Sequence, residues 1–255
     1  MSAARKGGAR GVTSVQQEEF SGFPTAAFTF LKQLADNNER DWFEARRETY
    51  EQSLRVPMRA LIEEMDARLA TFAPEIIGTV KGSMFRIHRD VRFSKDKSPY
   101  KTNAACWFFH RDSRGTVGQD AVHGGAGLYF QLEPRACFAG GGVWMPPAPV
   151  LKRVRTALDV GHEEFESIVS AKAFRKTFGA LDTEAMLKRM PRGFDAEHPA
   201  ATWLRHQSFT AGCALTQSEV TSARLADRLE EIFRTITPLV RWLNTAMGFR
   251  PHTSR

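Results

Sequence analysis

The segment GLYFQLEPRACFAGGGVW, residues 127–144, gives the clearest indication of the fold class. Apolar and polar residues alternate through GLYFQLE (127–133), and ACFAGGGVW (136–144) has the length and composition of a second strand. Pro134 and Arg135 separate the two runs, and such a short connection is typical of a β-hairpin. The sequence therefore predicts two adjacent antiparallel strands at this point.

Further strands are expected on both sides of the hairpin. Residues 104–110, AACWFFH, form an apolar run that indicates a strand buried on both faces, and residues 84–93 alternate in polarity. After the hairpin, HQSFTAGCAL (206–215) has the features of a last strand. These segments predict a mainly antiparallel sheet of about four to five strands.

Helical periodicity lies before and after the strands. The N-terminal part predicts helices over 25–36, over 39–52 with Asn38 as its N-cap, and from Pro57 to Pro74. The C-terminal part predicts helices around Leu151–Leu158, over 163–178 and over 217–247.

The order of helices, strands and helices predicts an α+β domain in which the sheet packs against N- and C-terminal helices. We expect a single domain over residues 20–248, preceded by a flexible basic tail (1–19) and followed by a tail (249–255). The second face of the sheet would then be available for a functional site.

The net charge of +7 comes from two short segments. Residues 1–17 contribute three Lys/Arg and no acid, whereas residues 84–102 contribute six Lys/Arg against two Asp. The rest of the chain has equal numbers of acidic and basic residues. A local excess of positive charge of this kind attracts phosphates, acidic metabolites or nucleic acid.

A strand over residues 84–93 would separate this basic segment into two faces. Its odd positions would face the core with Phe85, Ile87, Val91 and Phe93, together with Arg89. Arg89 is therefore expected to form a structural ion pair, with Asp41, Glu44 or Glu133 as the candidate partners. Its even positions would present Arg86, His88, Asp90 and Arg92 on a polar face.

An anion-binding site is the first functional hypothesis. Arg86 and Arg92 flank Asp90, and two fixed guanidinium groups bind a phosphate or a carboxylate well. The following turn adds Lys95, Lys97, Tyr100 and Lys101 as candidate ligand-binding residues. The alternative is that the three lysines belong to an ordinary solvated loop.

The hairpin extends this hypothesis to a possible reaction. Tyr129, Gln131 and Glu133 share one face of their strand. If that face also carries the polar residues of 84–93, then His88, Asp90, Tyr129 and Glu133 are candidate catalytic residues for acid–base chemistry beside a bound anion. The alternative is a sheet face that simply contacts water.

Three functions stay open at this point. The first is a protein that binds a small phosphate- or carboxylate-containing ligand, such as a nucleotide, with or without catalysis. The second is a nucleic-acid-binding module that uses the basic motif and the basic tail. The third is an interaction or scaffold protein in which the motif only stabilises the fold. A small anionic molecule is favoured over nucleic acid as the partner.

The motif RIHRDVRFSKDKSPYK (86–101) resembles the signature of a conserved, mainly bacterial family of unknown function. Its pattern is Arg-x-x-Arg-Asp-x-Arg-Phe followed by Asp-Lys and Tyr. Three other regions are also similar to that family, namely NNERDWFEARRETYE, GLYFQLEP with FAGGGVWMPPAPVLKRVR, and KRMPRGFDAEHP. The resemblance implies one domain over about 20–248 and assigns no catalytic residues.

Other kinds of site find little support in the sequence. The seven histidines form no HxxxH or HExxH pattern, so neither a metal site nor a cofactor is expected. The three cysteines are far apart and are expected to be reduced and mostly buried. Most of the five tryptophans are expected in the core, with Trp144 as the exception. No apolar run is long enough for a membrane span, so a soluble, cytoplasmic protein is expected.

Overall fold

In the computed structural model, which describes residues 19–113, 125–252 and 254, five strands form one antiparallel sheet with the order β1-β2-β3-β4-β5. The strands are β1 (Ile76–Ile77), β2 (Ala104–His110), β3 (Gly127–Leu132), β4 (Phe138–Val143) and β5 (Phe209–Ala214). The expected hairpin is the β3–β4 pair, and the expected α+β class is confirmed. Most of the expected N-terminal tail, residues 1–18, lies outside the described residues.

Helices precede and follow the strands, as the sequence predicts. The N-terminal ones are α1 (Thr25–Asp36), α2 (Arg40–Glu44), α3 (Arg47–Tyr50), the π-helical turn η1 (Glu51–Arg55), α4 (Val56–Phe72) and α5 (Val80–Ser83). The C-terminal ones are α6 (Ala148–Val160), α7 (His162–Ser170), α8 (Lys172–Phe178), α9 (Ala201–Leu204), α10 (Gln217–Thr221) and α11 (Leu225–Met247). The sequence analysis predicted neither the strand β1 nor the short helix α5.

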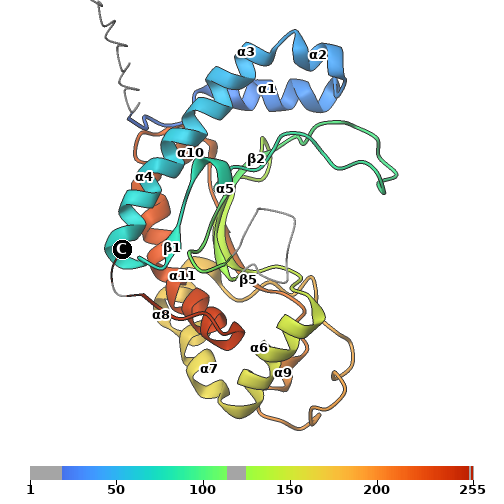
Figure 1. Ribbon diagram of the computed structural model, residues 1–255, viewed down its shortest axis with the longest axis vertical. Coiled ribbons are helices and arrows are strands. Elements are labelled where there is room, and N and C mark those ends of the chain that lie inside the picture. Colours follow the sequence, from blue (N-terminus) through green and yellow to red (C-terminus); the bar gives the residue numbers. More distant parts are fainter. Residues whose placement is uncertain (1–18, 114–124, 253, 255) are drawn as a thin grey trace, which may run out of the picture.

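The core lies between one face of the sheet and the helices α4 and α11 (Figure 1). Alternate residues of the strands supply it, because side chains at every second position share a face. Leu128 and Phe130 of β3 are fully buried, and Phe108 of β2 packs edge-on against Phe233 of α11 with ring centroids 5.7 Å apart. The opposite face of the sheet points away from both helices.

Glycines in β4 let the strands β4 and β5 approach each other closely. Gly142 has φ +122°, and a Cβ at this position would lie 1.9 Å from the carbonyl oxygen of Phe209. A Cβ at Gly140 would lie 2.1 Å from the carbonyl oxygen of Ala211. Residues with side chains do not fit here, which explains the glycine run that interrupts the apolar pattern of the strand.

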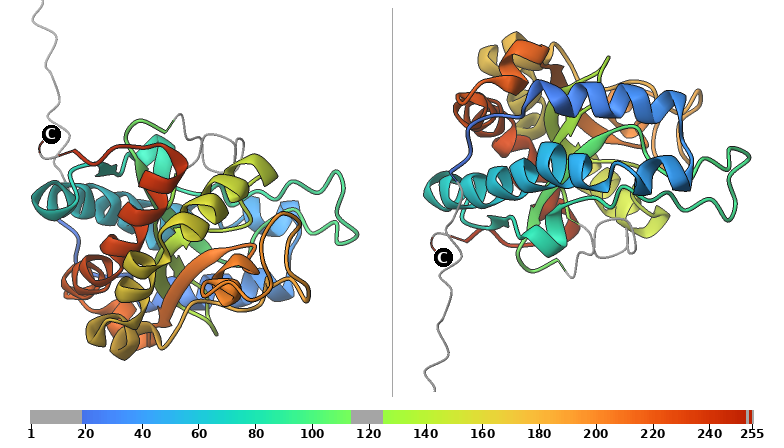
Figure 2. Two further views of the ribbon diagram at one scale, coloured as in Figure 1. Left: turned by 90° about the horizontal axis from the view of Figure 1, so that it is seen from below. Right: turned by 90° about the horizontal axis from the view of Figure 1, so that it is seen from above.

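The expected strand over 84–93 is wrong. Residues 84–103 instead form a projecting excursion, called the arm here, which leaves the body of the molecule and returns to β2 (Figures 1 and 2). At its base Met84 bridges Cys106, and further out His88 bridges Tyr100. A bend at Ile87 separates the two bridges and interrupts the strand alternation. The alternating polarity of residues 84–93 therefore belongs to an extended arm outside the sheet and not to a strand of the sheet.

Asn38 fastens the arm to the N-terminal helices. Its side-chain oxygen accepts a 3.0 Å hydrogen bond from the backbone N–H of Tyr100, and its side-chain nitrogen donates one of 3.0 Å to the carbonyl of Tyr100. The Tyr100 ring stacks on Phe43 of α2 with centroids 4.2 Å apart. The expectation that Asn38 caps the following helix is wrong: the N-cap is Glu39, and the Asn38 amide is used by the arm.

Asn38→Ala is expected to lower the free energy of unfolding by about 1–2 kcal/mol, because two partly buried backbone groups of Tyr100 lose their partner. Amide hydrogen exchange at Tyr100 and Lys101 should become faster. The matched control is Asn37→Ala, whose amide makes one exposed bond to the carbonyl of Gln33. Equal urea midpoints and equal amide protection for the two variants would contradict the role given to Asn38.

Candidate ligand-binding site on the open face of the sheet

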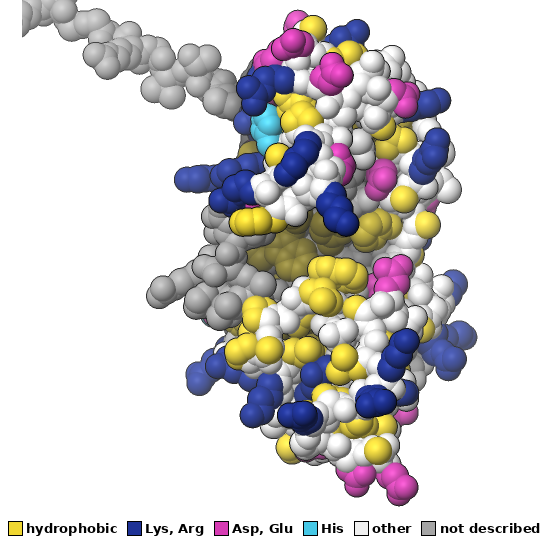
Figure 3. All heavy atoms as spheres, turned by 90° about the vertical axis from the view of Figure 1, so that its right-hand side faces the viewer, with side chains coloured by type: hydrophobic (Ala, Val, Ile, Leu, Met, Phe, Trp, Pro, Cys, Tyr) yellow, Lys and Arg dark blue, Asp and Glu magenta, His cyan; other side chains and the backbone are white. Residues whose placement is uncertain are grey.

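The face of the sheet that points away from α4 and α11, called the open face here, is partly exposed. The strand register places Trp107, Tyr129, Gly140 and Gly212 side by side in one row. The next row contains Ala105, Gln131, Phe138 and Ala214. This side of the molecule is hollowed, and hydrophobic side chains line the floor of the hollow (Figure 3).

Aromatic rings on the open face form a contiguous cluster. Tyr129 packs against Phe138 with centroids 5.3 Å apart and against Phe85, from the base of the arm, with centroids 5.8 Å apart. Phe85 reaches the open face because its backbone N–H bonds to the carbonyl of Ala105 at 3.1 Å. Trp107 lies beside Tyr129 in the strand register and is partly exposed. Such a cluster offers flat apolar surface to a ring-containing ligand.

Lys101 brings a positive charge to this cluster. Its Nζ lies 5.1 Å from the centroid of the Phe85 ring, within the range of a cation–π interaction. Burial lowers the pKa of the Lys101 ammonium. Within the described ranges, no carboxylate forms an ion pair with Lys101. A partly desolvated cation without a counter-charge beside an aromatic surface is a suitable partner for an anionic ligand group.

A chain of polar side chains crosses the same face. The Tyr129 hydroxyl donates a 2.8 Å hydrogen bond to Gln131 Oε1, and Gln131 Nε2 donates one of 2.7 Å to Glu133 Oε2. Burial raises the pKa of the Tyr129 hydroxyl well above its usual range, so this group stays protonated at neutral pH. The chain therefore links a carboxylate to a phenol that keeps its oxygen lone pairs for a ligand.

Two of the arm's six basic residues are paired with its two acids. Arg92 forms a bidentate pair with Asp90, with the shortest N–O distance 2.7 Å, and this pair lowers the pKa of Asp90 to about 2. Arg89 forms an ion pair with Asp96, which also accepts bonds from Ser98. The expected partners of Arg89, namely Asp41, Glu44 and Glu133, are thus wrong. The sequence interpretation assumed a strand, whereas the arm folds back on itself and brings Asp96 to Arg89.

The remaining residues of the basic motif lie in two different environments, one against the N-terminal helices and one at the tip of the arm. Tyr100 is buried against Phe43, so its ring is part of the core, and the His88 ring packs on Tyr100 with centroids 5.1 Å apart. Phe93, expected in the core, is instead 95% exposed because residues 91–98 form the tip of the arm. At this tip Lys97 donates a 3.0 Å bond to the carbonyl of Val91.

The structure brings together only part of the expected site. Tyr129, Gln131 and Glu133 form one chain, and Lys101 joins it through Phe85. In the described part of the chain, no hydrogen bond, ion pair or ring contact joins this group to Arg86, His88, Asp90 or Arg92. The sequence interpretation missed the roles of Phe85, Trp107 and Phe138. The position of Trp107 opposite Tyr129 depends on the register of β2 and β3, which the period of a strand does not determine.

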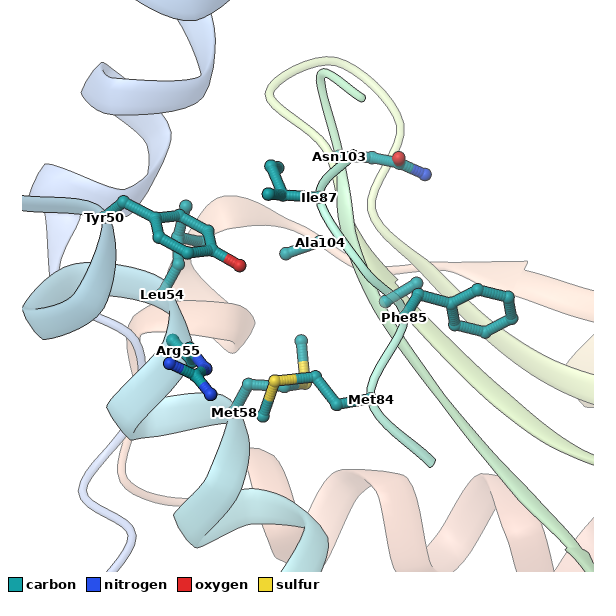
Figure 4. A pocket seen from close by; sticks show the side chains of 10 residues that line it. Tyr50, Leu54, Arg55, Met58, Met84, Phe85, Ile87, Asn103 and Ala104 are labelled. Carbon is teal, nitrogen blue, oxygen red and sulfur yellow. The ribbon is translucent and has the colours of Figure 1, made fainter. Parts of the chain in front are cut away.

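A second recess lies on the other side of the arm base, between η1, α4 and the arm (Figure 4). Its empty volume is about 270 Å³, including the open solvent at its mouth. Tyr50 and two methionines, Met58 and Met84, point into it, whereas Phe85 points away toward the sheet (Figure 4). Burial raises the pKa of Tyr50. The recess is small and mostly apolar; Tyr50, Asn103 and Arg55 also line it, and Arg55 is paired with Glu51.

The fold and the open face together define an α+β protein with helices on one side of an antiparallel sheet and an aromatic, partly polar surface on the other. The model of the family described as conserved hypothetical protein (DUF2461) matches residues 26–242, which is most of the chain. The chain therefore belongs to this family, and the resemblance to a conserved family of unknown function is confirmed. No curated protein and no solved structure matches the chain. No helix among the described residues combines the length and apolar character needed to cross a membrane.

Proposed function

We propose that this protein binds a small anionic ligand with a planar ring, of the nucleotide type, on the open face of the sheet. The observation that carries the proposal is the position of Lys101, a partly buried cation placed over Phe85 at the edge of the aromatic cluster. Burying an ammonium group without a counter-charge costs free energy. An anionic group of a ligand would supply that counter-charge and offset this cost.

The aromatic cluster supports the proposal that the ligand contains a planar ring. Tyr129, Phe85 and Phe138 present adjoining rings. Next to Tyr129 in its row of the sheet, the two glycines Gly140 and Gly212 have no side chains. Stacking a flat ring on aromatic side chains contributes about 1–3 kcal/mol per ring in nucleic-acid complexes. A row that combines rings with glycines gives a flat ligand both a stacking surface and space.

The charge distribution of the arm supports the proposal that the ligand is an anion. Because Arg89 and Arg92 are paired with Asp96 and Asp90, the excess of positive charge resides on Arg86, Lys95, Lys97 and Lys101. Lys101 is the one among these that contacts the aromatic cluster in the described part of the chain. Arg86 is exposed, one residue from Phe85. We therefore assign Lys101 as the first anion ligand and Arg86 as a second.

The polar chain supplies two groups for orientation or proton transfer. Tyr129 and Glu133 stay the candidate catalytic residues, since the amide of Gln131 connects them. Asp90 is a poor candidate for a base, because a carboxylate with a pKa of about 2 binds protons weakly. His88 packs on Tyr100. We assign no reaction to the site.

A thermal-shift screen with nucleoside monophosphates, diphosphates and small dicarboxylates tests the proposal. The wild-type protein is expected to be stabilised by at least one ring-containing anion, because binding to the folded state raises the unfolding temperature. Lys101→Met removes the charge and keeps the chain length, so it should abolish the shift and leave the fold intact. Arg86→Ala should reduce the shift.

The matched control is Lys32→Met, an exposed lysine of α1. It is expected to retain the full ligand shift. If Lys101→Met and Lys32→Met respond alike to every compound, the assignment of Lys101 is incorrect. If Arg86→Ala unfolds the protein in the absence of ligand, Arg86 is a structural residue and not a ligand contact.

The arm tip favours nucleic acid as a second candidate partner. Phe93 is exposed among Lys95, Lys97 and Arg92, and Arg92 lies 5.8 Å from the Phe93 ring. An exposed ring among cations is the arrangement that stacks on unpaired bases. On this alternative, Phe93→Ala and Lys95→Met should weaken binding of single-stranded DNA or RNA in fluorescence anisotropy, and binding should fall steeply as salt rises. Neither variant should alter the small-ligand shift.

A further inference from the structure

Three side chains that are far apart in the sequence meet where the C-terminal segment returns to the end of β2. They are His110, Asp112 and His252. One nitrogen of each imidazole and one carboxylate oxygen all lie within 4.8 Å of one another. Among the described residues, this is the one group of three or more His, Cys, Asp or Glu with ligand atoms so close together.

The fold brings His252 to this position through the end of α11. Gly248 adopts a left-handed conformation with φ +97°, and the backbone N–H of Phe249 bonds to the carbonyl of Asn244 at 2.8 Å. This is a helix C-cap that reverses the chain. Phe249 then packs on His110 with ring centroids 4.9 Å apart. The reversal directs residues 250–252 toward the end of β2.

One ring nitrogen of His110, Nε2, is hydrogen-bonded to the backbone, and the second, Nδ1, faces the carboxylate of Asp112. His110 Nε2 lies 2.9 Å from the carbonyl oxygen of Arg250 and therefore carries the ring proton. Nδ1 is then the unprotonated nitrogen, which accepts a long 3.2 Å bond from the backbone N–H of Asp112 and lies 3.9 Å from Asp112 Oδ2. A histidine that donates one N–H to a backbone carbonyl and directs the other nitrogen toward the metal is the usual arrangement at metal centres. An ion bound at Nδ1 would replace the long hydrogen bond from the backbone N–H of Asp112.

His252 and Asp112 are the other two candidate metal ligands. His252 Nε2 lies 2.8 Å from Asp112 Oδ2, and both side chains are partly exposed. Ligand atoms about 2 Å from a zinc ion lie about 3.3 Å from each other in a tetrahedron. The observed separations of 2.8 and 3.9 Å lie on either side of that value, and the ligand atoms of the two histidines lie within 4.8 Å of each other, so side-chain rotations would bring the three atoms around one ion.

We propose that His110, Asp112 and His252 form a binding site for a divalent transition-metal ion, with Zn²⁺ as the best fit. Two imidazole nitrogens and one carboxylate oxygen suit zinc and iron(II), and they leave at least one coordination position for water or another ligand. The ion would join the C-terminal segment to the end of β2. Short sequence patterns do not predict this site, because His252 lies 140 residues from Asp112 along the chain.

Titration with Co²⁺, followed by visible absorption and by displacement with Zn²⁺, tests this site on protein without an affinity tag. The wild-type protein is expected to bind one equivalent. Asp112→Asn and His252→Ala should each weaken binding at least about tenfold, since each removes a ligand. At the same concentration, Zn²⁺ should raise the unfolding temperature of the wild type more than that of Asp112→Asn.

A second grouping of the same residue types provides the matched controls. His198 Nε2 lies 3.7 Å from Asp159 Oδ1, and the His198 ring lies 5.6 Å from that of His162. Asp159→Asn and His198→Ala should bind Co²⁺ as the wild type does. The proposal is overturned if the wild type binds no metal, if both Asp112→Asn and His252→Ala keep wild-type affinity, or if the control variants lose binding equally.

Discussion

Arg241→Ala is expected to lower the free energy of unfolding by about 3 kcal/mol, because it leaves the carboxylate of Glu75 buried without its counter-charge. Glu75 is 1% exposed, and Arg241 contacts both of its oxygens, at 2.5 and 3.3 Å. Arg241 also donates a 2.8 Å bond to the carbonyl of Phe72. The pair thereby ties α11 to the turn between α4 and β1. Urea unfolding followed by circular dichroism measures the change.

Two further variants separate the buried pair from a general effect of losing an arginine. Arg234→Ala removes a pair between Arg234 and Glu230 on the same helix, and it should cost less than about 1 kcal/mol because Arg234 is half exposed. Glu75→Gln in the Arg241→Ala background should recover part of the loss, since an amide needs no counter-charge. Equal losses for Arg241→Ala and Arg234→Ala would contradict the importance of the buried carboxylate.

Gly212→Val is expected to weaken binding of the strongest ligand found in the screen at least about a hundredfold, or roughly 2.7 kcal/mol. Gly212 lies in the row with Trp107, Tyr129 and Gly140, so a valine there fills space on the open face. A Cβ at Gly212 would lie 3.2 Å from the carbonyl oxygen of Ala139, a tight contact that requires a shift of the neighbouring strand, so the variant should fold with a lower urea midpoint. Isothermal titration calorimetry provides the affinity, and a urea midpoint provides the check on folding.

Gly161→Val is the control for this prediction. It makes the same change between α6 and α7, outside the sheet, where an added Cβ meets nothing within 4 Å. Its affinity is expected to stay within about threefold of the wild type, because it lies away from the open face. A Gly212→Val variant that folds and binds with wild-type affinity would exclude the glycine row from the ligand site.

The fold could be predicted largely because local periodicity and long-range packing agree. The hairpin around Pro134 and the apolar run of β2 each need packing partners to bury their core faces, so an antiparallel sheet is expected from the sequence, whereas the order of its strands is not. Residues 84–93 show where this reasoning fails. Their alternation is that of a strand, but Asn38, more than sixty residues from Tyr100 along the chain, fastens the segment as an arm outside the sheet. A contact so distant in sequence leaves no mark on the local period.

Part of the candidate site was also predictable from local periodicity. Tyr129, Gln131 and Glu133 lie on one strand, so the period of two places them together. Lys101 was among the expected ligand-binding residues, but its contact with Phe85 depends on the bend at Ile87, which breaks the alternation. Arg89 was expected to need a carboxylate, and the arm's own turn supplies Asp96. The kind of partner that a charged side chain needs was therefore easier to predict than the residue that supplies it, because that residue depends on the path of the chain.

A crystal structure of the protein soaked with adenosine 5′-monophosphate, or with the strongest ligand of the screen, tests the central claim most directly. We predict difference density for the ring against Tyr129 and Phe85, with the anionic group at salt-bridge distance from Lys101 Nζ. Density at the arm tip around Phe93, or an open face that stays filled with solvent at saturating ligand, would contradict the assignment of this face as the binding site.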